Sequence, residues 1–400
     1  MRMAIEVAGF TPGQADELRR AMGHKRSREK MERLRGRLVE GMARNGISPQ
    51  LGARLYQMLS AFADYGFPES HAASFALIVY ISGYLKLHYA PEFYASLLNA
   101  QPMGFYSPAS LVADARRHGV IVLPPDVNAS AYECTVESYE TVDHGNGAVD
   151  LQGRPSRPCP ESTFALRIGL SQVRGIGEKH REFLNAERAR GAYLDMRDFV
   201  LRAQLSKDIV ESLAAVDAFA CFGLSRRDAV WEAQRLGDLP RAGALERAMT
   251  VDEQQVALPP MQPIEEAAAD FWGLSLSTRY QAIQFCREEL DKRRIYRASD
   301  LPTLPHRLVL KVAGVVTTRQ RPGTAKGYVF TTMEDETGLI NVIIRPDIYE
   351  RYRAVAREEP AVIVEGILQK QEGTINLLAR KFWKLDLARL EVGLTSRDFR

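Results

Sequence analysis

The residues from Val173 to Lys179, which read Val-Arg-Gly-Ile-Gly-Glu-Lys, have the types and the spacing needed to bind a phosphate group. Glycines let a phosphate approach the main chain without a Cβ in the way. The start of a helix adds N–H groups and the positive end of the helix dipole. We expect a helix to follow, through Phe183 and Leu184, with the charge of Lys179 beside its start. Such contacts grip a nucleic-acid backbone without reading its bases.

This segment is similar to the hairpin of a helix–hairpin–helix module. The candidate DNA-binding residues are Gly175, Ile176, Gly177, Glu178 and Lys179. An ordinary glycine turn between two packed helices is the alternative, but the apolar residue between the glycines, the lysine after them and the helical surroundings favour DNA. Residues 209–223 resemble a degenerate partner hairpin, which we expect to complete the core rather than to touch DNA.

Positive charge is concentrated between Leu18 and Arg37, although the net charge of the whole chain is only +3. Nine basic residues in this stretch outnumber two acidic ones, Glu29 and Glu32. A local excess of this kind attracts a polyanion. A solvated, arginine-rich helix face fits the same pattern, and charge alone does not separate the two interpretations.

Ser70 and His71 stand where a loop leads into an apolar helix, predicted from His71 to Tyr89. Ser70 is a good N-cap for it. A lone histidine beside a cap is more often a structural hydrogen-bonding group than a catalyst, but His71 is also placed to approach a triphosphate at the same helix start. Because apolar residues nearly encircle this helix, we expect it to be buried.

From Arg307 onward the apolar pattern has a period of two, which indicates strands. The predicted strands are 308–313, 328–333, 339–344, 361–368 and 374–382, with a helix at 348–357. Five strands with one helix between the third and the fourth is the layout of an OB-fold barrel.

In this last region the candidate DNA-binding residues are Arg319, Arg321, Lys326 and Tyr328. Basic residues interleaved with aromatic ones suit a single strand, because bases stack on rings while cations follow the phosphates. Tyr328 and Phe330 share one face of their strand, so both point into the barrel or both point out of it. The sequence leaves these two possibilities open.

Carboxylates arranged for catalysis are missing from the sequence. Two-metal phosphoryl transfer needs two or three of them on a shared rigid element, commonly as Asp-x-Asp on a strand, and that motif does not occur. The nearest cluster, Glu334-Asp335-Glu336, is interpreted as a solvated hairpin tip. We therefore expect no catalytic residue and no metal site in these 400 residues.

Composition indicates an ordinary globular protein of two or three domains, with 46% hydrophobic and 26% charged residues. No segment is long and apolar enough to span a membrane, and residues 1–3 lack the apolar core of a secretory signal, so we expect a cytoplasmic location. The four cysteines form no Cys-x-x-Cys pair, and reduced thiols are expected.

Three segments carry a family resemblance. Residues 18–23, 62–75 and 84–93 read Leu-Arg-Arg-Ala-Met-Gly, Phe-Ala-Asp-Tyr-Gly-Phe-Pro-Glu-Ser-His-Ala-Ala-Ser-Phe and Tyr-Leu-Lys-Leu-His-Tyr-Ala-Pro-Glu-Phe. They strongly resemble the fingers region of bacterial C-family DNA polymerases, which are DNA polymerase III alpha-like. Departures from the replicative members point to the error-prone subfamily, the ImuC type. They are Pro68-Glu69, the run 101–108, and the segments 321–327 and 396–400.

The resemblance implies DNA synthesis past damaged bases during an SOS-type response. It implies a DNA primer-template and deoxynucleoside triphosphates as substrates, with the sliding clamp and mutasome companion proteins as partners. The palm, with its catalytic aspartates and Mg²⁺, would lie upstream of Met1, so the chain alone is expected to be inactive. The residues that would contact the nucleotide's phosphates are Lys25, Arg26, Arg28, Ser70 and His71. Residues 175–179 would hold the duplex, and the OB fold would lie near the template strand.

The expected fold class is multidomain, with an all-α fingers remainder and a tandem helix–hairpin–helix block followed by an all-β OB-fold barrel. The expected parts are fingers at 1–142, a linker at 143–163, the helix–hairpin–helix block at 164–235, a connector with a helix at 236–300, the OB fold at 301–388 and a tail at 389–400. The alternative function is a stand-alone, non-catalytic DNA-binding or adaptor protein.

Overall fold

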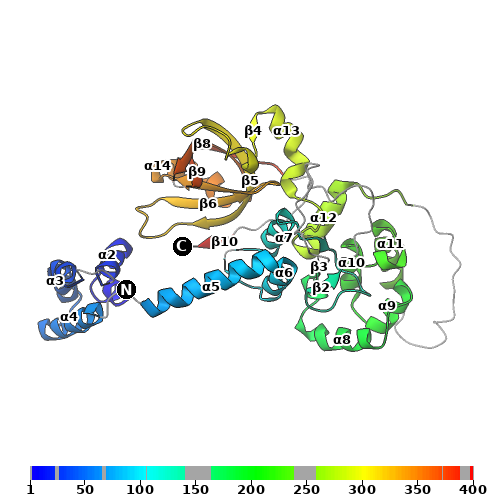
Figure 1. The fold of residues 1–400 in the computed structure, drawn as a ribbon, viewed down its shortest axis with the longest axis horizontal. Coiled ribbons are helices and arrows are strands. Elements are labelled where there is room, and N and C mark those ends of the chain that lie inside the picture. Colours follow the sequence, from blue (N-terminus) through cyan, green and yellow to red (C-terminus); the bar gives the residue numbers. More distant parts are fainter. Residues whose placement is uncertain are drawn as a thin grey trace.

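The computed structural model describes residues 2–22, 27–64, 69–104, 106–139, 164–237, 258–371, 373–387 and 397–399. Figure 1 shows three regions: a small bundle of N-terminal helices, a central helical block and a barrel of strands. One long helix runs from the bundle to the central block. The expected order, with helices first and the barrel last, is confirmed.

The N-terminal bundle consists of α1 (Arg2–Glu6), α2 (Pro12–Met22), α3 (Ser27–Arg44) and α4 (Pro49–Asp64). Apolar side chains at helical spacing on α2 and α3 meet in its centre, among them Leu18, Leu34 and Leu38. The basic residues of the same helices whose side chains are described lie outside this core, as the amphipathic pattern requires.

The long helix α5 (Glu69–His88) forms where the sequence predicts it, but the expectation that it is buried is wrong. Leu77, Val79, Tyr80 and Leu87 are each at least 60% exposed. Figure 1 shows why: α5 crosses from the bundle to α6 (Ala90–Asn99) as an isolated arm, so no neighbour covers most of its circumference. The chain therefore exposes a large apolar surface along one helix.

The central block combines helices with a small sheet. After α6 and α7 (Pro108–Arg117), strands β1 (Val122–Leu123), β2 (Thr135–Ser138) and β3 (Phe164–Arg167) pair in the order β1-β3-β2. The block expected to be helical from residue 164 therefore begins with a strand, because Ala165 and Leu166 pair in this sheet and are buried. One core contains residues from Ala90 to Leu276, so the segments on both sides of the expected linker, which itself lies outside the described residues, share it.

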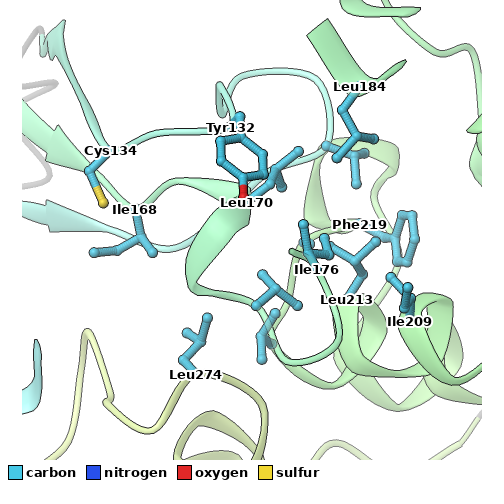
Figure 2. Close-up of a cluster of buried hydrophobic side chains, with 14 of the residues drawn as sticks. Tyr132, Cys134, Ile168, Leu170, Ile176, Leu184, Ile209, Leu213, Phe219 and Leu274 are labelled. Atoms are coloured by element: carbon cyan, nitrogen blue, oxygen red, sulfur yellow. The ribbon is translucent and has the colours of Figure 1, made fainter. Parts of the chain in front are cut away.

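The helix–hairpin–helix block follows on the same core. Its elements are η1 (Leu170–Gln172), η2 (Glu178–His180), α8 (Arg181–Ala189), α9 (Met196–Ala203), α10 (Lys207–Ala215), η3 (Ala220–Phe222) and α11 (Arg226–Gly237). Figure 2 shows Ile176 of the first hairpin beside Ile209, Leu213 and Phe219 of the second half. Because these side chains are at most 7% exposed, the second half completes the core, as the sequence predicts.

The connector is more regular than its composition suggests. Helix α12 (Pro263–Leu274), which the sequence analysis missed, packs on the central block, and its buried Asp270 accepts hydrogen bonds from Arg226 (2.8 Å) and Ser277 (2.5 Å). The sequence predicts a single helix in the connector, from about Tyr280 to Arg294, and it is present as the 3-10 turn η5 (Ala282–Cys286) and the short helix α13 (Arg287–Lys292). Residues 238–257 lie outside the described part.

The barrel matches the sequence expectation closely. Its strands are β5 (Val309–Gln320), β6 (Val329–Glu334), β7 (Leu339–Ile344), β8 (Ala361–Gln371) and β9 (Thr374–Lys384), closed by pairing of β5 with β8. Helices α14 (Pro346–Arg351) and α15 (Arg353–Glu358) fill the gap before β8. Two short strands, β4 (Ile295–Tyr296) and β10 (Arg397–Phe399), add to β5 in parallel, and most of the expected tail lies outside the described residues.

The exposed surface of α5 predicts self-association of the isolated chain. Burial of apolar surface is favourable, so a second copy is expected to cover these side chains at high protein concentration. The substitutions Leu77→Gln, Val79→Gln, Tyr80→Gln and Leu87→Gln, made together, should lower the associated fraction severalfold, as measured by light scattering after size exclusion.

The control for this prediction uses α4, where Leu51 and Met58 are also exposed but are not part of a long apolar surface. Leu51→Gln and Met58→Gln should leave the association unchanged. A wild-type chain that stays monomeric at every concentration would contradict the prediction.

Candidate nucleic-acid interface

The first hairpin presents its main chain to solvent. Val173 and Ile176 are buried and fix the turn, while Gly175 between them is exposed with a φ of +89°, a left-handed conformation that favours glycine. A Cβ at Gly175 would also lie 3.0 Å from the Cγ1 atom of Ile209. At Gly177 the corresponding position is open, with no atom within 4 Å. A phosphate can therefore approach the main chain at Gly177.

The predicted hairpin residues come together, with distinct roles. Lys179 is exposed at the start of the helical segment that η2 and α8 form. Glu178 is also exposed, but its carboxylate accepts hydrogen bonds from Arg181 (3.0 Å) and from the Tyr132 hydroxyl (3.3 Å). Because Glu178 is paired with Arg181, it does not offset the charge of Lys179 at this turn. Ile176 serves as the buried anchor.

Sequence reasoning missed His180. The main-chain N–H of Gly177 donates to its Nδ1 atom at 3.1 Å, and the N–H of His180 donates to the Gly177 carbonyl at 2.8 Å. The imidazole therefore accepts a main-chain N–H at the start of the helical segment, as the N3 side chain does in a capping box. A polar residue three positions after the second glycine was the signal for this role.

The loop between β5 and β6 carries the other predicted group. Arg321 and Lys326 are exposed, and the Arg321 guanidinium lies 5.1 Å from the centre of the Tyr349 ring. Tyr328 is half-buried and Phe330 is 39% exposed, whereas Val329 between them is buried. Both rings therefore belong to the outer face of the barrel, which decides the question that the sequence left open. In OB folds, this loop and the face of the second and third strands bind oligonucleotides.

Arg319 lies in a different environment from the other predicted residues. It is only 7% exposed, and its Nε donates to the Ala356 carbonyl at 2.9 Å, while a second guanidinium nitrogen donates to the Glu359 carbonyl. A register shift between Val316 and Thr318 changes the alternation of the strand. Arg319 consequently holds the end of α15 against β5 and is not part of the exposed surface.

The five residues expected near a nucleotide are only partly described. Lys25 and Arg26 lie outside the described residues, and Arg28 and Ser70 lie in the first turns of α3 and α5, where the side chains are not described. Because α5 begins at Glu69, Ser70 is inside the helix and is not its N-cap. His71 is exposed, with its ring edge-to-face on Phe75 at 4.6 Å.

The acidic triplet at the end of β6 has buried side chains, so its interpretation as a solvated tip is wrong. Glu334 accepts a hydrogen bond from Arg117 at 2.7 Å, and Glu336 accepts one from Arg287 at 2.8 Å. Asp335 is 1% exposed and accepts the main-chain N–H of Ala298 at 2.7 Å. Burial raises the pKa of Glu334 and of Asp335 above the ordinary values for carboxyl groups.

Among the residues that the structure describes, no group of three or more His, Cys, Asp or Glu side chains is placed to hold a metal ion. The acidic triplet does not fit Mg²⁺, because arginines and main-chain N–H groups already bind its carboxylates. No helix in the described ranges is both long and apolar enough to cross a membrane.

Three family models match separate parts of the chain. The bacterial DNA polymerase III alpha subunit finger domain matches residues 1–46, the helix–hairpin–helix motif matches 119–229, and the OB-fold nucleic acid binding domain matches 310–385. The helix–hairpin–helix match begins before β1, in agreement with the sheet that joins β1 and β2 to β3.

Relatives match the chain from end to end. Error-prone DNA polymerases from Mycolicibacterium paratuberculosis, Anaeromyxobacter dehalogenans and Rhodopirellula baltica are 44%, 42% and 40% identical over the whole chain. This chain is related to the bacterial error-prone DNA polymerases. It spans 34% of the first two relatives and 33% of the third, about a third of their length. A solved asparaginyl-tRNA synthetase from Pyrococcus horikoshii covers 22% of the chain at 24% identity, but its TM-score of 0.19 carries no information about fold or function.

The Arg117–Glu334 pair predicts a pH-dependent loss of stability in the variant Arg117→Met. Without the cation, the buried carboxyl of Glu334 has a still higher pKa. In the unfolded chain a glutamate carboxyl has a pKa of about 4.3. Because the pKa of Glu334 is higher in the folded state, the folded state loses stability as the pH rises above that value. Urea unfolding should show a loss that is small near that pH and reaches about 3 kcal/mol at neutral pH.

The control is the double variant Arg117→Met with Glu334→Gln, which leaves no buried charge at this position. It should recover most of the lost stability at neutral pH and remove the pH dependence. An equal loss at all pH values in Arg117→Met would argue against the pair as its cause.

Substitution of Arg319 is expected to affect stability, whereas substitution of Arg321, two residues further on, is expected to affect binding. Arg319→Ala leaves two carbonyls without their donor and should lower the free energy of unfolding by about 2 kcal/mol. Arg321→Ala should change that free energy by less than about 0.5 kcal/mol but weaken binding of a single-stranded oligonucleotide. Chemical denaturation and fluorescence anisotropy measure the two effects, and equal effects of the two substitutions on binding would refute the assignment.

Proposed function

We propose that this chain is the DNA-holding part of an error-prone DNA polymerase. The observation that carries the proposal is the 44% sequence identity with such an enzyme over the whole chain. Two exposed elements suited to nucleic acid, the first hairpin and the β5–β6 loop, add to it. The hairpin with Gly177 and Lys179 would hold the backbone of the duplex, and the β5–β6 loop would contact the single-stranded template. The alternative, a stand-alone adaptor, is not favoured, because the relatives are polymerases.

Within the same proposal, the whole enzyme extends primer-templates from deoxynucleoside triphosphates, past damaged bases and during damage-induced mutagenesis of the SOS type. The sliding clamp and the mutasome companion proteins are its proposed partners, and the cytoplasm is its proposed location. Mg²⁺ would be held by the carboxylates of a palm domain in the longer enzyme. Lys25, Arg26 and Arg28, together with Ser70 and His71 in the first turn of α5, would approach the triphosphate.

Lys179 provides the test of the DNA-holding role. Lys179→Glu should weaken binding of a short blunt duplex about eightfold near 0.1 M salt and lower the slope of log K against log salt by about 0.9, the value for one phosphate contact. Fluorescence anisotropy with a labelled duplex, repeated at several salt concentrations, measures both quantities.

Arg188→Glu is the matched control, because Arg188 is exposed on α8 but lies further along the helix than the hairpin. It should leave the slope unchanged. Equal effects of the two variants would contradict the role of the hairpin. Primer extension by the 400-residue chain with Mg²⁺ would contradict the proposal that this part holds DNA without performing the chemistry.

A further inference from the structure

A cleft lies where the N-terminal bundle meets the barrel. It has a volume of about 710 Å³ and is lined by α2 and α3 on one side and by the β5–β6 loop on the other. We call it the bundle–barrel cleft. In Figure 1 the end of the barrel beside β6 is turned toward the N-terminal helices. Its two walls are about three hundred residues apart in the sequence, so no sequence pattern reveals it.

The two walls are in direct contact at one edge of the cleft. A Cβ built on Gly323 of the β5–β6 loop would lie only 2.7 Å from the Cβ of Pro12, at the start of α2. A larger residue at position 323 would push the loop away from the bundle. Glycine at this position therefore lets the loop approach α2 closely and sets the width of the cleft.

Both walls of the bundle–barrel cleft are cationic. Arg20, Arg33 and Arg37 line the bundle side, and Lys326 lines the loop side. The two acidic residues of the lining are already paired: Asp16 with Arg20 at 2.8 Å, and Glu17 with Arg37 at 3.3 Å.

Arg33 and Lys326 are the two cations of the lining for which the structure describes no ion-pair partner. Among the residues that the structure describes, no carboxylate lies within ion-pair distance of either side chain. Like charges on facing walls repel each other unless an anion lies between them. A chain of phosphates satisfies both walls at once and releases its own counterions on binding.

The surroundings of Lys326 distinguish a single strand from a duplex. Tyr328 follows it by two residues, and Phe330 lies on the same outer face of β6. Exposed rings beside a cationic groove bind unpaired bases by stacking, which is not possible for bases inside a duplex. Rings suited to free bases therefore follow, within four residues along the chain, the lysine that lines the cleft.

We propose that the bundle–barrel cleft binds the sugar–phosphate backbone of a single nucleic-acid strand, between Arg33 of α3 and Lys326 of the β5–β6 loop. The inference rests on the proposed role in holding DNA and adds a site that neither the bundle nor the barrel has by itself. The same phosphate chemistry occurs in a free nucleoside triphosphate, which the experiment separates from a strand.

The test measures binding of labelled oligothymidylate to the 400-residue chain carrying Arg33→Glu, Lys326→Glu or both. Each single variant should weaken binding about fivefold near 0.1 M salt and lower the slope of log K against log salt by about 0.7, the value for one contact with a single strand. The double variant should show both losses together. Lys326→Arg keeps the charge and should bind within about twofold of the wild type.

Matched controls are Arg54→Glu on α4 and Arg380→Glu on β9, because both arginines are exposed and neither lines the cleft. Both should bind oligothymidylate as the wild type does. A blunt duplex, held by the hairpin, should bind equally well to the wild type and to the cleft variants.

Two results would overturn the inference. Oligothymidylate binding that is unchanged in the cleft variants, while Lys179→Glu still weakens duplex binding, would remove the cleft as a site and leave the proposed function standing. Displacement of the oligonucleotide by deoxythymidine triphosphate, with weaker triphosphate binding in the cleft variants, would make the cleft a nucleotide site. Failure of the proposed function differs from both, because neither duplex nor single strand would then bind.

Discussion

The barrel is joined to the central block by a largely buried ion pair between Arg117, at the end of α7, and Glu334, at the end of β6. The two residues that follow Glu334 bind further elements: Asp335 holds the main chain at Ala298, and Glu336 holds Arg287 of α13. Three consecutive acids thus connect the barrel to three other segments. Since buried charges are costly without their partners, these contacts leave little freedom in the orientation of β6.

Because β6 is held at Glu334, the direction of the strand also fixes the position of its first residue, Val329, and of the loop before it. The strand runs from the β5–β6 loop to the acidic triplet, so the loop with Lys326 is directed toward the N-terminal helices. Arg319 strengthens this arrangement, because its guanidinium holds α15 against the strand that leads into the loop. The buried contacts of Arg117 and Arg319 therefore help to determine where the exposed Lys326 lies. The buried and the exposed basic residues have separate roles.

The helix α5 shows a different relation between composition and structure. Its residues are apolar on all sides, as in a core helix, yet within the described part of the chain it has few neighbours. The polymerases that match the chain are about three times as long. An apolar helix without partners is the kind of surface that a larger assembly covers. Its exposure is consistent with a segment that folds in a larger context.

Local sequence determined the elements whose signal lies in a few neighbouring residues. The period of two placed the five barrel strands, and two glycines with a lysine placed the exposed hairpin, because strand alternation and turn geometry are local constraints. Tertiary structure decided what depends on distant residues: the burial of Arg319 and Glu334, the exposure of α5, and the placement of Arg33 and Lys326 in one cleft. Burial and charge pairing depend on partners that are distant in the sequence, 37 residues away for Arg319 and Ala356 and 217 for Arg117 and Glu334, so no local pattern identifies them.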